Sequence, residues 1–77
     1  MKQQIIDLVA ELLNVPADTI TEETRASDIE SWDSLNHVLI IGALEERLGI
    51  VLPLDEAVEI TTVKELLDAC LGSSGSR

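Results

Sequence analysis

The sequence predicts an all-α fold, a small four-helix bundle with three longer helices, one short helix and a long ordered loop between the first two. Apolar residues recur at helical spacing in three separate stretches, and capping residues or glycine stand at the ends of these stretches. The one stretch that looks like a strand by composition, residues 50–52, has no second strand to pair with. The chain of 77 residues is short enough for one domain, which we place at 1–71.

The first helix is predicted over residues 2–14, where apolar side chains form the wide stripe of an amphipathic helix. Asn14 and Pro16 end it, because proline disfavours the helical conformation in the residue before it. Residues 15–32 follow with no sustained periodicity and with several Ser and Thr hydroxyls, which bond locally to the backbone and favour turns. This stretch is therefore predicted to be the long loop.

Two apolar residues of the loop, Ile20 and Ile29, are expected to insert into the core and hold the loop in place. Within the loop, Ser27 to Glu30 fit a capping box that would start a single helical turn. Loops of this length in compact domains are usually functional or disordered, and the two isoleucines favour an ordered loop.

The central helix is predicted over residues 34–48, the longest helical pattern in the chain. The residues expected to face the core have helical spacing: Val38, Ile41, Leu44 and Leu48, with Ile40 broadening the stripe. Leu35, Leu39 and Gly42 share an adjoining face. Gly49 stands where a left-handed residue commonly ends a helix.

The last third of the chain is predicted to hold a short helix at about 55–59, opened by Pro53 and Asp55. Thr62 and Glu65 then fit a capping box for a last helix that ends at Gly72. The apolar stripe of this helix consists of Val63, Leu66, Leu67 and Cys70.

Cys70 is the single cysteine, so an internal disulfide is impossible, and its place on the apolar stripe indicates a core residue instead of a reactive thiol. The tail 72–77 is rich in Gly and Ser, and we expect it to be disordered, as a linker or an expression remnant outside the domain.

The charge is strongly acidic: 15 acidic residues against 5 basic ones give −10 at pH 7. Such a field repels nucleic-acid phosphates and anionic lipid, so neither is expected as a partner, and basic protein surfaces are favoured. The simpler alternative is that the charge only keeps a small protein soluble. No apolar run approaches the roughly 18 residues of a membrane span, and nothing resembles a secretory leader, so we expect a cytoplasmic monomer.

A serine directly after an acid, Asp33-Ser34-Leu35, stands where the loop meets the central helix. Together with Ala43-Leu44-Glu45-Glu46 and with Ile60-Thr61-Thr62-Val63, this motif resembles the acyl carrier proteins over nearly the whole chain to Leu71. The resemblance implies that a phosphopantetheinyl transferase converts the Ser34 hydroxyl into a phosphodiester that bears a 4′-phosphopantetheine cofactor. It also implies that Asp33 helps to hold the magnesium ion of that transferase.

The same resemblance implies a protein that is not itself an enzyme but carries acyl groups as thioesters between synthase and acyl-transferring enzymes with basic docking surfaces. The acyl chain would be partly sheltered among the helices. The residues expected to meet these partners are Leu35, Asn36, Leu39, Gly42, Glu45, Glu46, Asp55 and Glu56.

Simpler interpretations of the motif remain open. Asp33 or Ser34 could serve only as a helix N-cap. Ser34 and His37 are three residues apart and could form a nucleophile–base pair, but a hydrolase would also need an orienting acid, oxyanion donors and a closed pocket. The chain has no Gly-x-Ser-x-Gly turn that would raise the serine. His37 itself is expected to be a solvated helix residue, or else to touch the prosthetic phosphate.

Resident metal sites do not fit the sequence. A calcium loop that starts at Asp28 would place Asp33 where glycine is needed and Leu39 where a bidentate glutamate is needed. One histidine and one cysteine are too few for a zinc cluster.

The pathway is less defined than the carrier function. Fatty-acid carriers commonly have Asp at the position of Asn36 and Glu at that of Leu39, so a polyketide or other specialised pathway is favoured over fatty-acid synthesis. Peptidyl or aminoacyl carriers are an alternative, although they usually show Gly-Gly-x-Ser where this chain has Ser31-Trp32-Asp33-Ser34. A third alternative is an unmodified acidic helical adaptor. Leu39 belongs either to an apolar docking patch with Leu35 and Gly42 or simply to a wider buried face.

Overall fold

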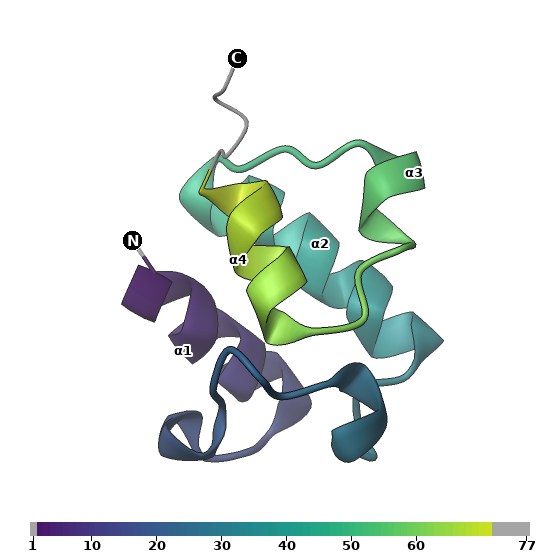
Figure 1. The fold of residues 1–77 in the computed structure, drawn as a ribbon. Coiled ribbons are helices and arrows are strands. Elements are labelled where there is room, and N and C mark those ends of the chain that lie inside the picture. The colour runs from purple at the N-terminus through teal and green to yellow at the C-terminus, as the bar shows by residue number, and fades with distance from the viewer. Residues whose placement is uncertain (1, 72–77) are drawn as a thin grey trace.

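The computed structural model describes residues 2–71, so the predicted disorder of the tail 72–77 concerns residues outside the described part. The helices in chain order are α1 (Lys2–Leu13), α2 (Ser34–Leu48), α3 (Leu54–Ala57) and α4 (Val63–Cys70), with two 3-10 turns, η1 (Ala17–Thr19) and η2 (Ala26–Asp28), in the connection between α1 and α2 (Figure 1). Residues 2–71 contain no strand, and their isolated β-bridge pairs Arg25 with Thr62. The all-α class with four helices is confirmed. None of the helices in this part of the chain is both long enough and apolar enough to cross a membrane.

Two of the predicted helix ends have left-handed backbone. Asn14, with φ of 59°, follows the last residue of α1, and Gly49, with φ of 69°, follows α2. At the end of α2 the Gly49 amide donates to the Glu45 carbonyl at 3.1 Å and the Ile50 amide donates to the Leu44 carbonyl at 3.1 Å. These bonds satisfy carbonyls that the helix leaves unpaired and turn the chain toward α3.

Other helix starts differ from their predictions by small shifts. The turn η2 begins after Arg25, whose amide donates to Asp28 Oδ2 at 3.0 Å, so the capping box predicted at Ser27 and Glu30 is wrong. The short helix α3 begins at Leu54 after Pro53, one residue before the predicted start. The N-cap residues, Arg25 and Pro53, have no side-chain oxygen for capping, so the usual capping residues do not mark these two starts.

One of the two hydrogen bonds of the capping box predicted for α4 is present. Thr62 Oγ1 accepts from the Glu65 amide at 3.1 Å, as a capping box requires. The return bond goes one residue further out, because Glu65 Oε1 accepts from the Thr61 amide at 2.8 Å. This backbone hydrogen bond and the one from the Thr61 hydroxyl are the main reasons why the pKa of Glu65 is lowered.

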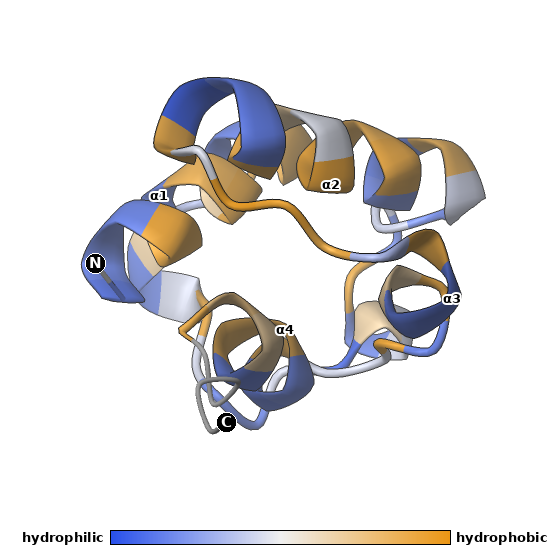
Figure 2. Cartoon of the chain, turned by 90° about the horizontal axis from the view of Figure 1, so that it is seen from above, coloured by the Kyte–Doolittle hydropathy of each residue, from blue (hydrophilic) through white to orange (hydrophobic). Residues whose placement is uncertain are grey.

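The core is aliphatic apart from Trp32 and lies where α1, α2 and α4 meet. Its fully buried side chains are Ile5, Val9, Leu13, Ile40, Leu44, Val63 and Leu66. In Figure 2 the apolar colour lies along α2 and continues along the extended segment after it. Cys70 is half-buried and packs against this core as predicted, and desolvation raises its pKa to about 11, which disfavours the reactive thiolate.

The predicted core face of α2 needs one correction. Val38 is 59% exposed, whereas Ile40, which was expected only to broaden the stripe, is completely buried together with Leu44. Ile41 and Leu48 are half-buried. The helix is apolar around much of its circumference, so spacing alone allows several rotations about its axis, and packing against α1 and α4 selects the rotation centred on Ile40 and Leu44.

The long connection crosses from α1 to α2 along the bottom of Figure 1 and is bonded to the segment before α4. The Ala26 amide donates to the Thr61 carbonyl at 2.8 Å, and the Val63 amide donates to the Thr24 carbonyl at 2.9 Å. Ile20 is buried and Ile29 is half-buried, and both contact the core as predicted. Just before α2, the Ser31 hydroxyl donates to the Leu13 carbonyl at 2.8 Å, which ties the start of α2 to the end of α1.

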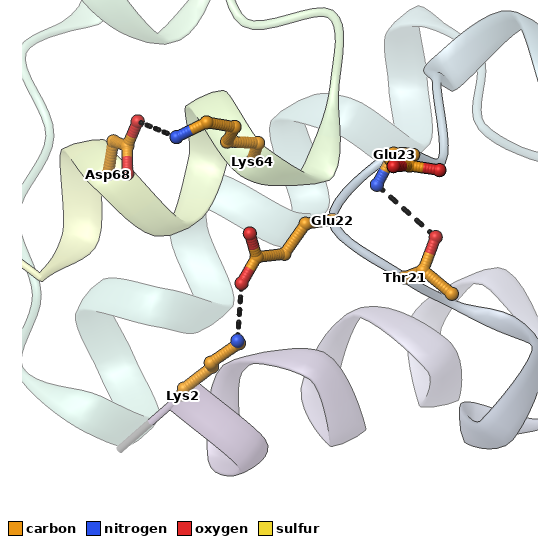
Figure 3. Close-up of polar contacts among 6 residues, drawn as sticks. All are labelled: Lys2, Thr21, Glu22, Glu23, Lys64 and Asp68. Carbon is orange, nitrogen blue, oxygen red and sulfur yellow. Dashed lines mark hydrogen bonds and ion pairs between the residues drawn. The ribbon is translucent and has the colours of Figure 1, made fainter.

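Exposed ion pairs add contacts around the same connection (Figure 3). The Lys2 ammonium pairs with Glu22, whose pKa is lowered mainly by this hydrogen bond, and Lys64 pairs with Asp68 within α4 at 3.3 Å. Glu22 also accepts the Lys64 amide at its backbone carbonyl, at 3.0 Å. These contacts bring the start of α1, the loop and the first turn of α4 together on one side of the bundle.

Candidate functional site

The junction between the loop and α2 presents Ser34 to solvent. Ser34 is the first residue of α2, its side chain is exposed, and its hydroxyl makes no hydrogen bond to any residue of the described part. Asp33 is the N-cap, with extended backbone, and its Oδ1 accepts from the Asn36 amide at 2.9 Å. The cap fixes the direction of the first turn, and therefore holds the serine at a defined point on the surface.

The first turn of α2 suits an anionic substituent on that hydroxyl. The backbone amides of Ser34 and Leu35 have no hydrogen-bond partner within residues 2–71, as expected at a helix N-terminus. Free amides and the positive end of the helix dipole stabilise a phosphate at this position. The residues present therefore fit a phosphodiester on Ser34.

Asp33 retains one carboxylate oxygen for another partner. Oδ1 holds the cap, while Oδ2 makes no hydrogen bond to the described residues. No group of three or more potential His, Cys, Asp or Glu metal ligands occurs within residues 2–71.

Trp32 and His37 form a hydrogen-bonded pair directly beside the serine. Trp32 is 6% exposed, and its indole Nε1–H donates to His37 Nδ1 at 3.0 Å, with the two rings stacked at a centroid distance of 6.1 Å. His37 Nε2 lies 2.7 Å from the carbonyl oxygen of Ala57 at the end of α3. The expectation of a solvated His37 is therefore wrong, because both ring nitrogens are engaged in the fold.

The hydrogen bonds of His37 also decide whether Ser34 and His37 could act as a nucleophile–base pair. A general base needs a nitrogen free to accept the serine proton. In His37 one nitrogen already accepts from Trp32 and the other faces Ala57. Ser34 and His37 are therefore adjacent without forming a catalytic pair.

A groove of about 470 Å³ lies next to the serine. Its wall consists mostly of apolar side chains from the connection before α2, from the start of α2 and from the segment after α3. The lining residues are Ala26, Trp32, Asp33, Ser34, His37, Val38, Val58 and Ile60. A flexible group attached to Ser34 could lie in this groove.

The residues predicted to meet partners are mostly on the surface. Leu35 is 68% exposed and Leu39 is 48% exposed, so the alternative that Leu39 belongs to the buried face is not supported. A Cβ at Gly42 would meet no atom within 4 Å, so this glycine leaves open space beside Leu39. The four acids of the predicted partner face are all exposed: Glu45, Glu46, Asp55 and Glu56.

Asn36 behaves differently from the other predicted partner residues. It is half-buried, and its side-chain Nδ2 donates to the Ser31 carbonyl at 2.6 Å. Its backbone amide also donates to Asp33. Asn36 thus closes the turn before α2, a role that the sequence analysis did not foresee.

Three further exposed apolar residues near the site were missed: Val38, Leu54 and Val58, at 59%, 71% and 62% exposure. Val38 was assigned to the core because its spacing fits an apolar stripe. Leu54 is the first residue and Val58 the C-cap of a helix of only four residues, in which no periodic pattern can develop. The contact of His37 with Ala57 spans 20 residues of sequence, and no local signal indicates it.

Comparison with known proteins identifies the family of the chain. Residues 3–70 match the family described as phosphopantetheine attachment site. The chain is 37% identical over 68 residues to the acyl carrier protein of Syntrophobacter fumaroxidans (strain DSM 10017 / MPOB), covering 88% of this chain and 84% of that protein. It is also 37% identical over 67 residues to the acyl carrier protein of Rickettsia canadensis (strain McKiel), covering 87% of this chain and 78% of the relative. The chain therefore belongs to the acyl carrier protein family, whose members bear 4′-phosphopantetheine and carry acyl groups without catalysing a reaction themselves.

Proposed function

We propose that Ser34 is the residue that receives the 4′-phosphopantetheine arm. The observation that carries this proposal is the position of its hydroxyl: exposed, unbonded within the described residues, and fixed at the first turn of α2 by the Asp33 cap. The free amides of Ser34 and Leu35 favour the phosphodiester that attachment creates. When bound, the arm supplies a terminal thiol for the thioester, and Ser34 only anchors it.

Asp33 has two functions in this proposal. Its Oδ1 holds the first turn of α2, and its Oδ2 completes the coordination of the magnesium ion that the transferase brings. A phosphopantetheinyl transferase has to bring its reacting centre up to Ser34, and the exposure of the junction permits this approach.

Attachment is tested by incubating the chain with coenzyme A and a phosphopantetheinyl transferase of broad specificity, then measuring the intact mass. The wild-type chain should gain one phosphopantetheinyl group, and Ser34→Ala should gain none while keeping its helical circular dichroism. Ser27→Ala is the matched control, because Ser27 is an exposed serine of the adjacent loop. Modification of the Ser34→Ala chain would refute the assignment, and a wild-type chain that resists modification would favour the acidic adaptor.

We further infer that the carrier serves a polyketide or other specialised pathway more readily than fatty-acid synthesis. The supporting observation is Leu39, which is exposed on α2 where fatty-acid carriers commonly present Glu. An apolar side chain at this point favours partners with an apolar contact there. Aminoacyl or peptidyl cargo is the second candidate, and loading assays with acyl- and aminoacyl-coenzyme A analogues, followed by transfer to purified synthases, distinguish the two.

The partner surface combines apolar and acidic side chains. Leu35 and Leu39 lie on α2 with Glu45 and Glu46, and α3 adds Asp55 and Glu56 to this exposed set. Basic docking surfaces on the synthase enzymes would be steered toward these acids, and screening over about 8 Å at physiological salt weakens such steering. Association rates should therefore fall as salt rises. A rate that stays constant from low to high ionic strength would show that apolar contact dominates the encounter.

A further inference from the structure

His37 stands between the proposed attachment point and the buried interior. On α2 it follows Ser34 by three residues and precedes Ile40 and Leu44 by three and seven, which places it on the helix face that leads inward. Ile40 and Leu44 are completely buried, whereas Ser34 is exposed. A phosphopantetheine arm with its acyl group that ran from Ser34 along the inner face of α2 would therefore pass His37 before it reached the core.

The hydrogen bonds of His37 fix the roles of its two ring nitrogens. An indole N–H can only donate, so His37 Nδ1 must accept from Trp32. Nε2 faces a carbonyl oxygen, which can only accept, so Nε2 donates to Ala57. Trp32, His37 and Ala57 thus form one continuous chain of hydrogen bonds from the loop through α2 to α3.

These linked hydrogen bonds help to hold α3 in position against α2. The helix has four residues, and the large apolar side chains at its ends, Leu54 and Val58, are mostly exposed. Ala57 is its buried residue, at 1% exposure, and an alanine contributes little apolar area. Within residues 2–71, the bond from His37 to Ala57 is the hydrogen bond that joins α2 to α3.

We propose that His37 limits the cargo to short acyl groups, by holding α3 against α2 and so closing the way from the groove beside Ser34 to Ile40 and Leu44. The cargo then lies in the groove of about 470 Å³, against Trp32, Val38 and Val58. A longer alkyl chain extends into solvent or onto a partner enzyme. This inference rests on attachment at Ser34, and it names the class of substrate that the attached arm carries.

The test uses chain length as its variable. The full-length protein is loaded with butyryl, hexanoyl, octanoyl or decanoyl pantetheine from the corresponding acyl-coenzyme A, and the intact mass confirms loading. Burial of additional methylenes would raise the melting temperature with each step. We expect the wild-type melting temperature to change by less than about 2 °C from the butyryl to the decanoyl form, because the added methylenes stay outside the core.

Two variants separate the hydrogen bonds of His37. The amide of Asn reaches the position of Nδ1, so His37→Asn can still accept from Trp32 but loses the bond to Ala57. The longer Gln reaches the position of Nε2, so His37→Gln keeps a donor for Ala57. We expect the decanoyl form of His37→Asn to melt about 5 °C or more above its butyryl form, and His37→Gln to remain as insensitive to chain length as the wild type.

A second measurement does not depend on how well the variants fold. In the wild-type protein, the amide NMR signals of Ile40 and Leu44 should be the same in the butyryl and decanoyl forms, while the fluorescence of Trp32, the single tryptophan, responds to loading in both. A wild-type melting temperature that rises steadily with chain length, or shifted Ile40 and Leu44 signals, would overturn the proposal. Insensitivity of His37→Asn to chain length would also overturn it. Failure of loading itself shows up in the mass and would instead contradict attachment at Ser34.

Discussion

Both faces of α2 carry aliphatic side chains, but those on the inner face are buried and those on the outer face are exposed. Ile40 and Leu44 on the inner face have no exposed surface, whereas Leu35 and Val38 on the outer face are more than half exposed. Aliphatic side chains are therefore not by themselves a sign of the core. On the inner face they stabilise the bundle, and on the outer face they lie beside Ser34, where contact with other proteins can use them.

The difference arises from what each face meets. The inner face packs against α1 and α4, so its residues lose all contact with water. The outer face borders the groove beside Ser34, solvent and a second groove in which Leu39 and Gly42 lie with Leu12 of α1. Gly42 adds no side chain of its own there. One helix thus combines a buried face that stabilises the bundle with the exposed face that we propose for partner recognition, and substitutions should separate the two.

The largest expected effect is on the inner face. Leu44→Ala should lower the free energy of unfolding by about 2–5 kcal/mol, because it removes buried methyl groups and leaves a cavity. Such a loss is a large share of the roughly 5–15 kcal/mol available to a domain. Urea unfolding followed by circular dichroism and Trp32 fluorescence measures it. Leu35→Ala is the matched control on the outer face and should cost about 0.5 kcal/mol or less; equal losses at both positions would remove the distinction between the faces.

Much of this arrangement could be predicted from the sequence, because it depends on local signals. The three longer helices follow from apolar spacing and from caps such as Gly49 and Thr62, and the short helix follows from Pro53. The position of Ser34 at a helix start follows from the motif around it. The rotation of α2 could not be predicted in the same way. Val38 and Ile40 are equally apolar, and only packing against other elements decides which of them is buried.

The contacts around the site also could not be predicted from local sequence patterns. The sequence indicates Asp33 and Ser34 but gives no reason to connect His37 with Ala57, 20 residues further on. It equally suggests Asn36 as a free surface residue, although its side chain is bonded to the Ser31 carbonyl. Contacts of this kind depend on where a loop and a short helix finally lie, which is a property of the whole fold.

The next expected effect concerns the start of α2, where both faces begin. Asp33→Ala removes the cap and should lower the free energy of unfolding by about 1 kcal/mol, while also slowing modification by the transferase. Asp33→Asn separates the two roles, since Asn caps about as well as Asp but is a poorer ligand for magnesium. We expect near wild-type stability and slow modification for Asp33→Asn. Normal modification of this variant would show that Asp33 is only a cap.

The smallest expected effect on stability is the most informative about the outer face. Leu39→Glu replaces a half-exposed apolar side chain with the acid that fatty-acid carriers commonly have there, and should change the free energy of unfolding by about 0.5 kcal/mol or less. The same substitution should weaken transfer to the cognate synthase, which loses an apolar contact, and improve recognition by fatty-acid enzymes. Chemical unfolding and transfer assays on the loaded protein measure the two effects. Leu39→Met retains the apolar contact and should leave both unchanged, so a domain that unfolds with Glu but tolerates Met would place Leu39 in the core and remove the docking patch.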